Sequence, residues 1–189
     1  MEKPASNKIY IMMNKPCGYV CSAVSDSHQT VYELLPGPLR SLAQNAKRGK
    51  RLHTVGRLDC NTSGLLLFTT DGDFSNYLTR PYNHIPKTYE VTLKTPVEET
   101  EQTDYVSRAK QGVILPAEKK APEQKSAGAR LEFLSPTLCH ITLTEGKFHE
   151  VRRLFMALGN EVKALRRIAM GKYELPEDLE EGMFRNFIP

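Results

Sequence analysis

The sequence has no run of apolar residues close to the roughly 20 that a membrane span requires. Its first residues, MEKPASNKIY, are polar and of mixed charge, so they lack the apolar segment of an export signal. With 189 residues, of which 40% are hydrophobic, the chain can bury one substantial core or two smaller ones. We therefore expect a globular protein that is cytoplasmic and does not bind a membrane.

Paired cysteines and clustered metal ligands are also missing. The four cysteines form no C-x-x-C pair and the five histidines are scattered, which argues against a zinc site. There is no dinucleotide fingerprint, no P-loop and no motif for a serine or cysteine nucleophile. We expect reduced structural cysteines, no metal and no cofactor.

The sequence has no large excess of charge of either sign, and the net charge of +4 is weak evidence for any partner. Its distribution is more informative, because residues 40–57 contain basic side chains and no acid. The basic residues of this run are Arg40, Lys47, Arg48, Lys50, Arg51 and Arg57. Such a run is often a solvated loop. This one leads directly into the stretch GRLDCNTSGLLLFTTDG at 56–72, which makes contact with phosphates a second interpretation.

The pattern of apolar residues predicts an α+β protein. Short apolar or alternating runs predict strands within 8–16, 64–72, 87–94, 129–136 and 139–146. Helices are predicted within 73–81, 96–112 and 147–160. Asp73 is the expected cap of the first of these helices, and Gly159 the expected C-terminal cap of the last.

The same pattern of apolar residues also indicates how the chain is organised into domains. No internal repeat or long linker interrupts it, so residues 1–189 are expected to form a single catalytic domain built of two packed halves. Residues 116–128, PAEKKAPEQKSAG, are polar and without period, which predicts an exposed flexible loop. Contact of this loop with RNA is conceivable, but nothing in its sequence supports it.

The stretch at 56–72 places Arg57 and Asp59 two positions apart, so in an extended chain both side chains project from the same side. The guanidinium then favours the ionised form of the carboxylate. Two structural interpretations stay open. Asp59 can cap the turn DCNTSG, or the two residues can form an ordinary surface ion pair. The adjacent apolar run GLLLF favours a functional carboxylate, because charge beside an apolar wall is costly.

A second arginine pair lies in the predicted helix at 147–160. At 100° per residue, Arg152 lies at the edge of the apolar stripe formed by Phe148, Val151 and Phe155. Arg153 points away toward solvent, where a phosphate or an acidic neighbour could meet it. Both arginines can equally be solvated residues of a surface helix.

These residues belong to segments that resemble the pseudouridine synthases, specifically the RsuA-like branch that modifies ribosomal RNA. The likeness runs from about Tyr10 to Phe187 and rests on four segments in the expected order. MNKPCGYVCS resembles the first motif, GRLDCNTSGLLLFTTDG the second and EGKFHEVRRLFMALGNEV the third, while KTYEV resembles the segment with the active-site tyrosine. The resemblance implies a mixed, mainly antiparallel sheet with flanking helices and a central catalytic cleft.

The resemblance also implies roles for individual residues. Asp59 is the catalytic carboxylate, Tyr89 packs against the target base, and Arg152 pairs with Asp59. A core tyrosine would show the same alternation as Tyr89, so that interpretation stays open. The residues that the resemblance and the charge pattern suggest for substrate binding are Arg57, Lys15, Lys87, Arg153, Arg48 and Arg51.

The implied reaction is the isomerisation of one uridine of ribosomal RNA, with small-subunit RNA favoured. The carboxylate either attacks the nucleoside or abstracts a sugar proton, and the sequence does not distinguish the two. The first motif begins close to the N-terminus, so no S4-type RNA-binding module is expected ahead of it. We expect a monomer whose partner is ribosomal RNA. The alternative is a noncatalytic RNA-binding factor of the same fold that acts in ribosome assembly.

Overall fold

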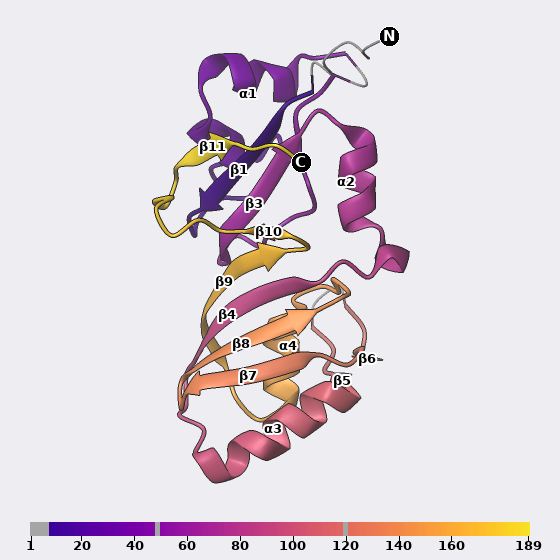
Figure 1. Ribbon diagram of the computed structural model, residues 1–189, viewed down its shortest axis with the longest axis vertical. Coiled ribbons are helices and arrows are strands. Elements are labelled where there is room, and N and C mark those ends of the chain that lie inside the picture. Colours follow the sequence, from indigo (N-terminus) through magenta and orange to yellow (C-terminus); the bar gives the residue numbers. More distant parts are fainter. Residues whose placement is uncertain (1–7, 48–49, 119–120) are drawn as a thin grey trace. The chain divides into compact units, whose positions relative to one another are not determined.

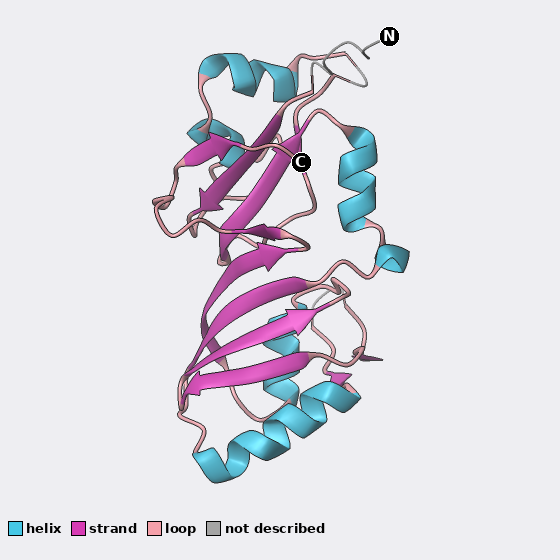
Figure 2. Ribbon diagram, viewed as in Figure 1, coloured by secondary structure: helices cyan, strands magenta, loops and turns pink. Residues whose placement is uncertain are grey.

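The computed structural model describes residues 8–47, 50–118 and 121–189, and the chain divides into two compact units (Figure 1). The first unit comprises the chain up to Asn83 together with Leu175–Pro189, and the second comprises His84–Glu174. Each unit contains antiparallel strands and helices (Figure 2). In the described part of the chain no helix is long and apolar enough to cross a membrane.

The first unit is built on β1, which pairs antiparallel with β3 on one side and with β11 on the other. The strand β2 adds to β3. The bounds of these strands are Tyr10–Lys15 for β1, His53–Thr54 for β2, Ser63–Thr69 for β3 and Phe184–Asn186 for β11. Both β1 and β3 are buried along nearly their whole length, which explains why they appear in the sequence as continuous apolar runs. The helical segments of this unit are Val31–Leu34 (η1), Gly37–Gln44 (α1), Gly72–Thr79 (α2) and Pro81–Asn83 (η2).

The N-cap of helix α2 lies two residues before the cap that the sequence predicts, and the helix begins at Gly72. Its N-cap is Asp71, whose side chain accepts hydrogen bonds from the backbone N–H groups of Asp73 and Phe74. The expectation that Asp73 caps the helix is therefore wrong. Asp71 is the better cap because the chain is still extended there, as the cap position requires.

The second unit contains a four-stranded antiparallel arrangement in the order β9-β4-β8-β7, and β10 pairs with β9. The strand bounds are Lys87–Leu93 (β4), Arg130–Ser135 (β7), Leu138–Leu143 (β8), Val162–Met170 (β9) and Tyr173–Glu174 (β10). A separate short pair joins Ile114–Leu115 (β5) to Gln124–Lys125 (β6). The helices are Glu99–Gln111 (α3) and Glu150–Ala157 (α4).

The core of the second unit lies between its strands and the two helices. Val91 and Leu93 of β4 are buried in it, and Tyr89 packs against it from a half-buried position. The alternation predicted for this strand is thus confirmed. Beside Tyr89 the register between β4 and β9 shifts by one residue, since Thr88 pairs with Ala169 but Tyr89 pairs with Arg167. Such a bulge redirects side chains locally.

More than half of the described residues in the segment 116–128 are exposed, as its sequence predicts, but parts of it are ordered into the fold; residues 119–120 lie outside the described part, and the flexibility stays a prediction. The segment contains β6, and Ala121 and Ser126 within it are buried. The Ser126 hydroxyl accepts from the backbone N–H of Val113 and donates to the carbonyl of the same residue. Because few apolar residues anchor this segment, its hydrophobic pattern gives no sign of these contacts.

Helix α4 is shorter than the predicted 147–160. It begins at Glu150, directly after His149, which has a left-handed backbone with φ of 47°. The stripe formed by Val151, Phe155 and Leu158 is buried as predicted, whereas Phe148 is 41% exposed. The helical period does not extend back to Phe148, because the left-handed residue turns the chain before the helix begins.

Candidate active site

The turn that contains Asp59 lies directly before β3 and is held from beneath by Lys15, the last residue of β1. The Lys15 side chain is completely buried, and its ammonium group donates to the carbonyls of Pro16, Asp59, Cys60 and Thr62 at 2.8–3.4 Å. Burial lowers the pKa of Lys15, and the nearby Asp59 carboxylate opposes this shift. Lys15 was expected to bind substrate. With its donors turned to these carbonyls it is instead the support of the Asp59 turn.

Two further contacts hold the same turn against the first motif. The backbone N–H of Gly18 donates to the Cys60 carbonyl at 2.8 Å. The Cys21 thiol lies against Leu58, receiving its N–H at 3.3 Å and facing its carbonyl at 3.4 Å. The first and second motifs therefore form one structure, in which backbone groups on either side of Asp59 are fixed.

Exposure along this turn agrees with the alternation expected for Arg57 and Asp59. Leu58 is 6% exposed and points into the core, while Arg57 is exposed and Asp59 is half-buried. Asp59 is thus partly exposed at its turn although the backbone beneath it is fixed. This combination suits a reactive group on a rigid support.

The basic run 40–57 is only partly available to a ligand. Arg40 donates to the carbonyls of Glu33 and Leu35, and the Arg51 guanidinium donates to the carbonyl of Ala43. Lys47 and Lys50 are exposed. Arg48 lies outside the described residues.

In the second unit, three candidate groups lie on neighbouring strands. Tyr89 and Lys87 belong to β4, and Arg167 of β9 pairs in register with Tyr89. Burial lowers the pKa of Lys87, and the positive charge of Arg167 lowers it further. Arg167 is 2% exposed and was not identified from the sequence. The one feature of the sequence that could have indicated its burial is the alternation of strand residues, because Arg167 lies two positions after the buried Leu165 on the same face of β9.

The two arginines of α4 differ from each other, but in the opposite sense to the prediction for Arg153. Arg152 is half-buried and donates to the carbonyl of Val162 at 3.1 Å. Arg153 is completely buried, and it donates to four carbonyls, those of Leu115, Pro116, Pro122 and Phe148. The prediction that Arg153 binds a substrate phosphate is therefore wrong. The segment that follows β5 covers this face of the helix, which the helical wheel alone cannot show.

The described residues divide the candidates between the units. Asp59 and Arg57 belong to the first, and Tyr89, Lys87 and Arg152 to the second. The pairing of Asp59 with Arg152 stays a prediction. No three His, Cys, Asp or Glu side chains of the described residues gather in a way that could hold a metal ion.

Comparison with known proteins decides the family. The family model for RNA pseudouridylate synthase matches residues 9–157. The chain belongs to this family. It is 40% identical to the ribosomal small subunit pseudouridine synthase A of Haemophilus influenzae over 176 residues, which are 93% of this chain and 68% of that protein. The corresponding Escherichia coli K12 protein is 40% identical over 93% of this chain and 69% of its own length.

Solved structures agree on the fold of this pseudouridylate synthase family member. A crystal structure of a pseudouridylate synthase matches with a TM-score of 0.82 and 40% identity, covering 96% of this chain and 71% of that one. An H/ACA RNP bound to a substrate RNA matches with a TM-score of 0.60 at 17% identity, over 92% of this chain and 50% of that one, which indicates a common fold only. The predicted α+β fold, a mixed and mainly antiparallel sheet with flanking helices, is confirmed.

Proposed function

We propose that this protein isomerises a specific uridine of small-subunit ribosomal RNA to pseudouridine. The observation that carries the proposal is its 40% identity, over 93% of the chain, to synthases named for the small ribosomal subunit. We further propose that the enzyme acts as a monomer in the cytoplasm.

The reaction breaks the C1′–N1 glycosidic bond, turns the uracil and forms a C1′–C5 bond. N1 gains a proton and C5 loses one, so the composition of the nucleoside does not change and no redox partner is needed. Asp59 is the proposed catalytic residue, because an ionised carboxylate can act either on the sugar carbon or on a sugar proton. Arg152 and Arg57 are proposed to favour its ionised form.

The fixed turn beneath Asp59 supports this role. Lys15, Gly18 and Cys21 all bind the backbone of residues 58–62, so the backbone that carries the carboxylate is held in one position. A catalytic group that is already oriented loses little freedom when the substrate binds. Rigid support of a partly exposed aspartate is the arrangement that the proposed chemistry needs.

The target uridine has to leave its stack before it can react, at a cost of about a few kcal/mol that is least in unpaired RNA. Tyr89 is proposed to pack against the extruded base, and Arg57 and Lys87 to hold the nucleotide. Stacking on an aromatic ring offsets part of that cost, since it is worth roughly 1–3 kcal/mol per base.

The test is to map pseudouridine across both ribosomal RNAs in cells with and without the protein, and then with Asp59→Asn. We expect one small-subunit site to disappear without the protein and to return with the wild type but not with D59N. Asp73→Asn is the matched control, because it neutralises an exposed carboxylate on α2 and should restore the site.

Three outcomes would contradict the proposal in different ways. A site lost from large-subunit RNA would keep the reaction and change the substrate. Full restoration by D59N would remove Asp59 from catalysis. An unchanged pseudouridine map, together with a defect in small-subunit assembly, would favour the noncatalytic assembly factor.

A further inference from the structure

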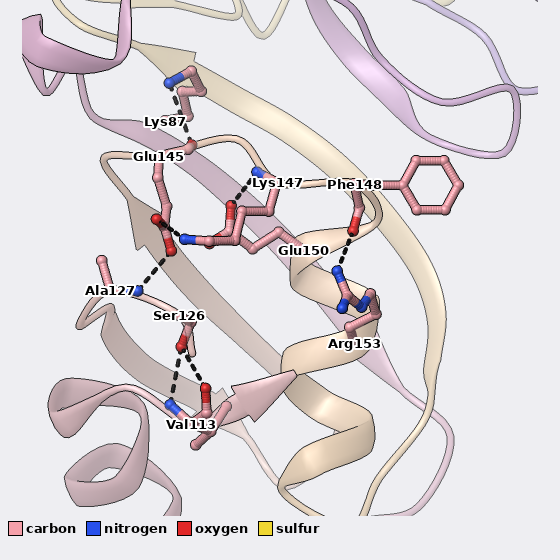
Figure 3. A network of polar contacts seen from close by, with 9 residues as sticks. All are labelled: Lys87, Val113, Ser126, Ala127, Glu145, Lys147, Phe148, Glu150 and Arg153. Carbon is pink, nitrogen blue, oxygen red and sulfur yellow. Dashed lines mark hydrogen bonds and ion pairs between the residues drawn. The ribbon is translucent and has the colours of Figure 1, made fainter. Parts of the chain in front are cut away.

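Two glutamates of the third motif, Glu145 and Glu150, face each other in the turn that joins β8 to α4 (Figure 3). Glu150 is 4% exposed. Its Oε2 accepts the backbone N–H of Lys147 at 2.8 Å. Its Oε1 is buried and receives a hydrogen bond from no donor in the described residues, although the carboxyl group of Glu145 lies beside it. An ionised carboxylate in that position would leave an oxygen both buried and unsatisfied, which is costly.

A single proton removes this cost. Protonated on Oε1, Glu150 becomes a donor and Glu145, as a carboxylate, becomes its acceptor. We propose that Glu145 and Glu150 share one proton, and that the resulting hydrogen bond positions the start of α4, and with it Arg152, for the reaction. The part of this inference that concerns activity rests on the proposed function, whereas the shared proton does not.

Glu145 connects this pair to three other parts of the second unit (Figure 3). Its Oε1 accepts the backbone N–H of Ala127 at 2.6 Å, and its Oε2 pairs with the Lys147 ammonium. Its backbone carbonyl accepts from the Lys87 ammonium at 3.4 Å. The pair therefore joins the segment before β7, the beginning of β4 and the first turn of α4. A change in its protonation reaches both Lys87 and the helix that carries Arg152.

The charged groups around Glu150 are already engaged with other partners. Within the turn, the Lys147 ammonium contacts Glu145. On α4, Arg153 donates to backbone carbonyls, and at its N-cap the His149 ring contacts Glu118 of the covering segment at 2.9 Å. From the strands, Lys87 of β4 donates to two carbonyls and feels the charge of Arg167 on β9.

The expected protonation states agree with this geometry. Burial and the adjacent Glu145 raise the pKa of Glu150 to about 8. Burial alone would raise the pKa of Glu145 as well, but its hydrogen bonds with Glu150, Lys147 and Ala127 hold it below the usual range. Near neutral pH the pair thus carries one proton. Above about pH 8 both groups ionise, and two neighbouring carboxylates repel each other.

The consequence for the enzyme is a loss of order at alkaline pH. When the shared proton leaves, we expect the Glu145 side chain to turn away, which breaks its contact with the backbone of Ala127 and loosens the turn before Arg152. Pseudouridine formation should therefore decline above about pH 8, with the midpoint at the pKa of Glu150.

Glu150→Gln tests the inference, because the amide donates to Glu145 as the acid does but cannot lose that proton in this pH range. Single-turnover rates on a small-subunit RNA fragment are measured from about pH 6 to about pH 10. We expect E150Q to retain the wild-type rate near neutral pH and to lack the decline above about pH 8. Glu145→Gln leaves only one carboxylate in the pair, so no repulsion arises when Glu150 ionises, and the decline should disappear in this variant as well. Glu132→Gln, which changes an exposed glutamate of β7, should leave the profile unchanged.

A second measurement does not depend on activity. Carbon-13 NMR of the glutamate side-chain carboxyl groups should show one that titrates near pH 8 in the wild type and is missing in E150Q. A Glu150 signal that titrates in the ordinary range of about 4–5 would overturn the shared proton. An alkaline decline that persists in a folded E150Q would overturn the positioning role. Should the wild type form no pseudouridine at any pH, the proposed function fails, while the NMR titration still decides on the pair.

Discussion

At the scale of single residues, the cationic side chains divide into supports and candidates for substrate contact. Lys15 and Arg153 are completely buried, and each is surrounded by four backbone carbonyls. Carbonyl oxygens in turns are not paired with backbone N–H groups of a helix or a neighbouring strand. A buried cation can therefore satisfy several of them at once. Lys15 thereby fixes the turn of Asp59, and Arg153 joins the segment from β5 to Pro122 to the turn before α4. Neither role is visible in the sequence, where a lysine or arginine in a polar motif suggests an exposed charge.

The support role of Lys15 predicts a stability effect. Lys15→Met keeps most of the side-chain volume but removes the donor to four carbonyls, and we expect the free energy of unfolding to fall by about 2–4 kcal/mol. Urea denaturation measures the change. Lys94→Met is the control, since Lys94 is exposed and its ion pair with Glu161 is worth about 1 kcal/mol or less.

RNA binding separates this role from the one expected from the sequence. If Lys15 contacted a phosphate, K15M would leave stability unchanged and reduce the salt dependence of RNA binding. A support for the turn gives the reverse result, with lower stability and an unchanged dependence on salt.

At the scale of the elements, helix ends were predicted well where glycine or proline marks them. Helix α3 ends at Gln111 with Gly112 as its C-cap, whereas the C-cap of α4 is Leu158 and Gly159, the expected cap, lies one residue beyond it with φ of 93°. Helix beginnings were less certain, because Asp71 and Asp73 are both suitable caps and only the backbone distinguishes them. The burial of Arg153 and the ordered part of residues 116–128 have one cause. The segment and the arginine bind each other, and a helical wheel cannot show a partner without apolar residues.

The two glycine positions allow a matched prediction. Both Gly112 and Gly159 have positive φ, so alanine is strained at either position, by about 1–2 kcal/mol. A Cβ at Gly159 meets no atom within 4 Å, whereas at Gly112 it would lie 2.4 Å from the carbonyl oxygen of Ser126. We expect Gly112→Ala to destabilise the protein by at least about 2 kcal/mol more than Gly159→Ala, because the backbone after β6 has to move. Urea denaturation of both variants measures the difference, and equal losses would contradict the close packing of α3 against residues 126–127.

The N-cap of α2 predicts a dependence of stability on acid. Burial alone would raise the pKa of Asp71, but hydrogen bonds from Lys8, Tyr10 and the backbone of Phe74 lower it to about 2. A carboxylate with a depressed pKa contributes stability above its unfolded pKa of 3.8, and this contribution disappears as the pH falls through about 2.

Asp71→Asn retains the Oδ1 that caps the helix, but it removes the charge and replaces the Oδ2 that accepts from Tyr10 and Lys8 by an amide donor. We expect it to be less stable than the wild type by about 1–2 kcal/mol near neutral pH, with the gap closing between about pH 4 and pH 2. Urea denaturation across this range is the measurement, with Asp73→Asn as the control. A gap that stays constant down to pH 2 would show that the charge of Asp71 does not stabilise the fold.

At the scale of the whole molecule, the net charge of +4 is too small to attract RNA without a local concentration of basic groups. In the second unit, several basic residues are neutralised by an acidic neighbour. They include Lys94 with Glu161, Arg108 with Asp104 and Arg130 with Glu132. The run 40–57 differs from these positions because it contains no acidic residue, and its Lys47 and Lys50 are exposed. We therefore expect this run to supply more phosphate contacts than the net charge suggests.

Salt dependence of RNA binding tests this expectation, because each phosphate contact adds about 0.7–0.9 to the slope of log K against log salt. Replacing Lys47, Arg48, Lys50 and Arg51 by glutamine should lower the slope by about 3 if all four contact phosphates. Arg51 already donates to the Ala43 carbonyl, so a reduction of about 2.1–2.7 would mean that three of the four contact phosphates and would assign Arg51 to the fold. The matched control removes the same four charges from ion-paired positions, Lys94, Arg108, Arg130 and Arg185. If both quadruple variants lower the slope equally, net charge rather than the run 40–57 attracts the RNA. An unchanged slope in the first variant would make this run an ordinary solvated loop.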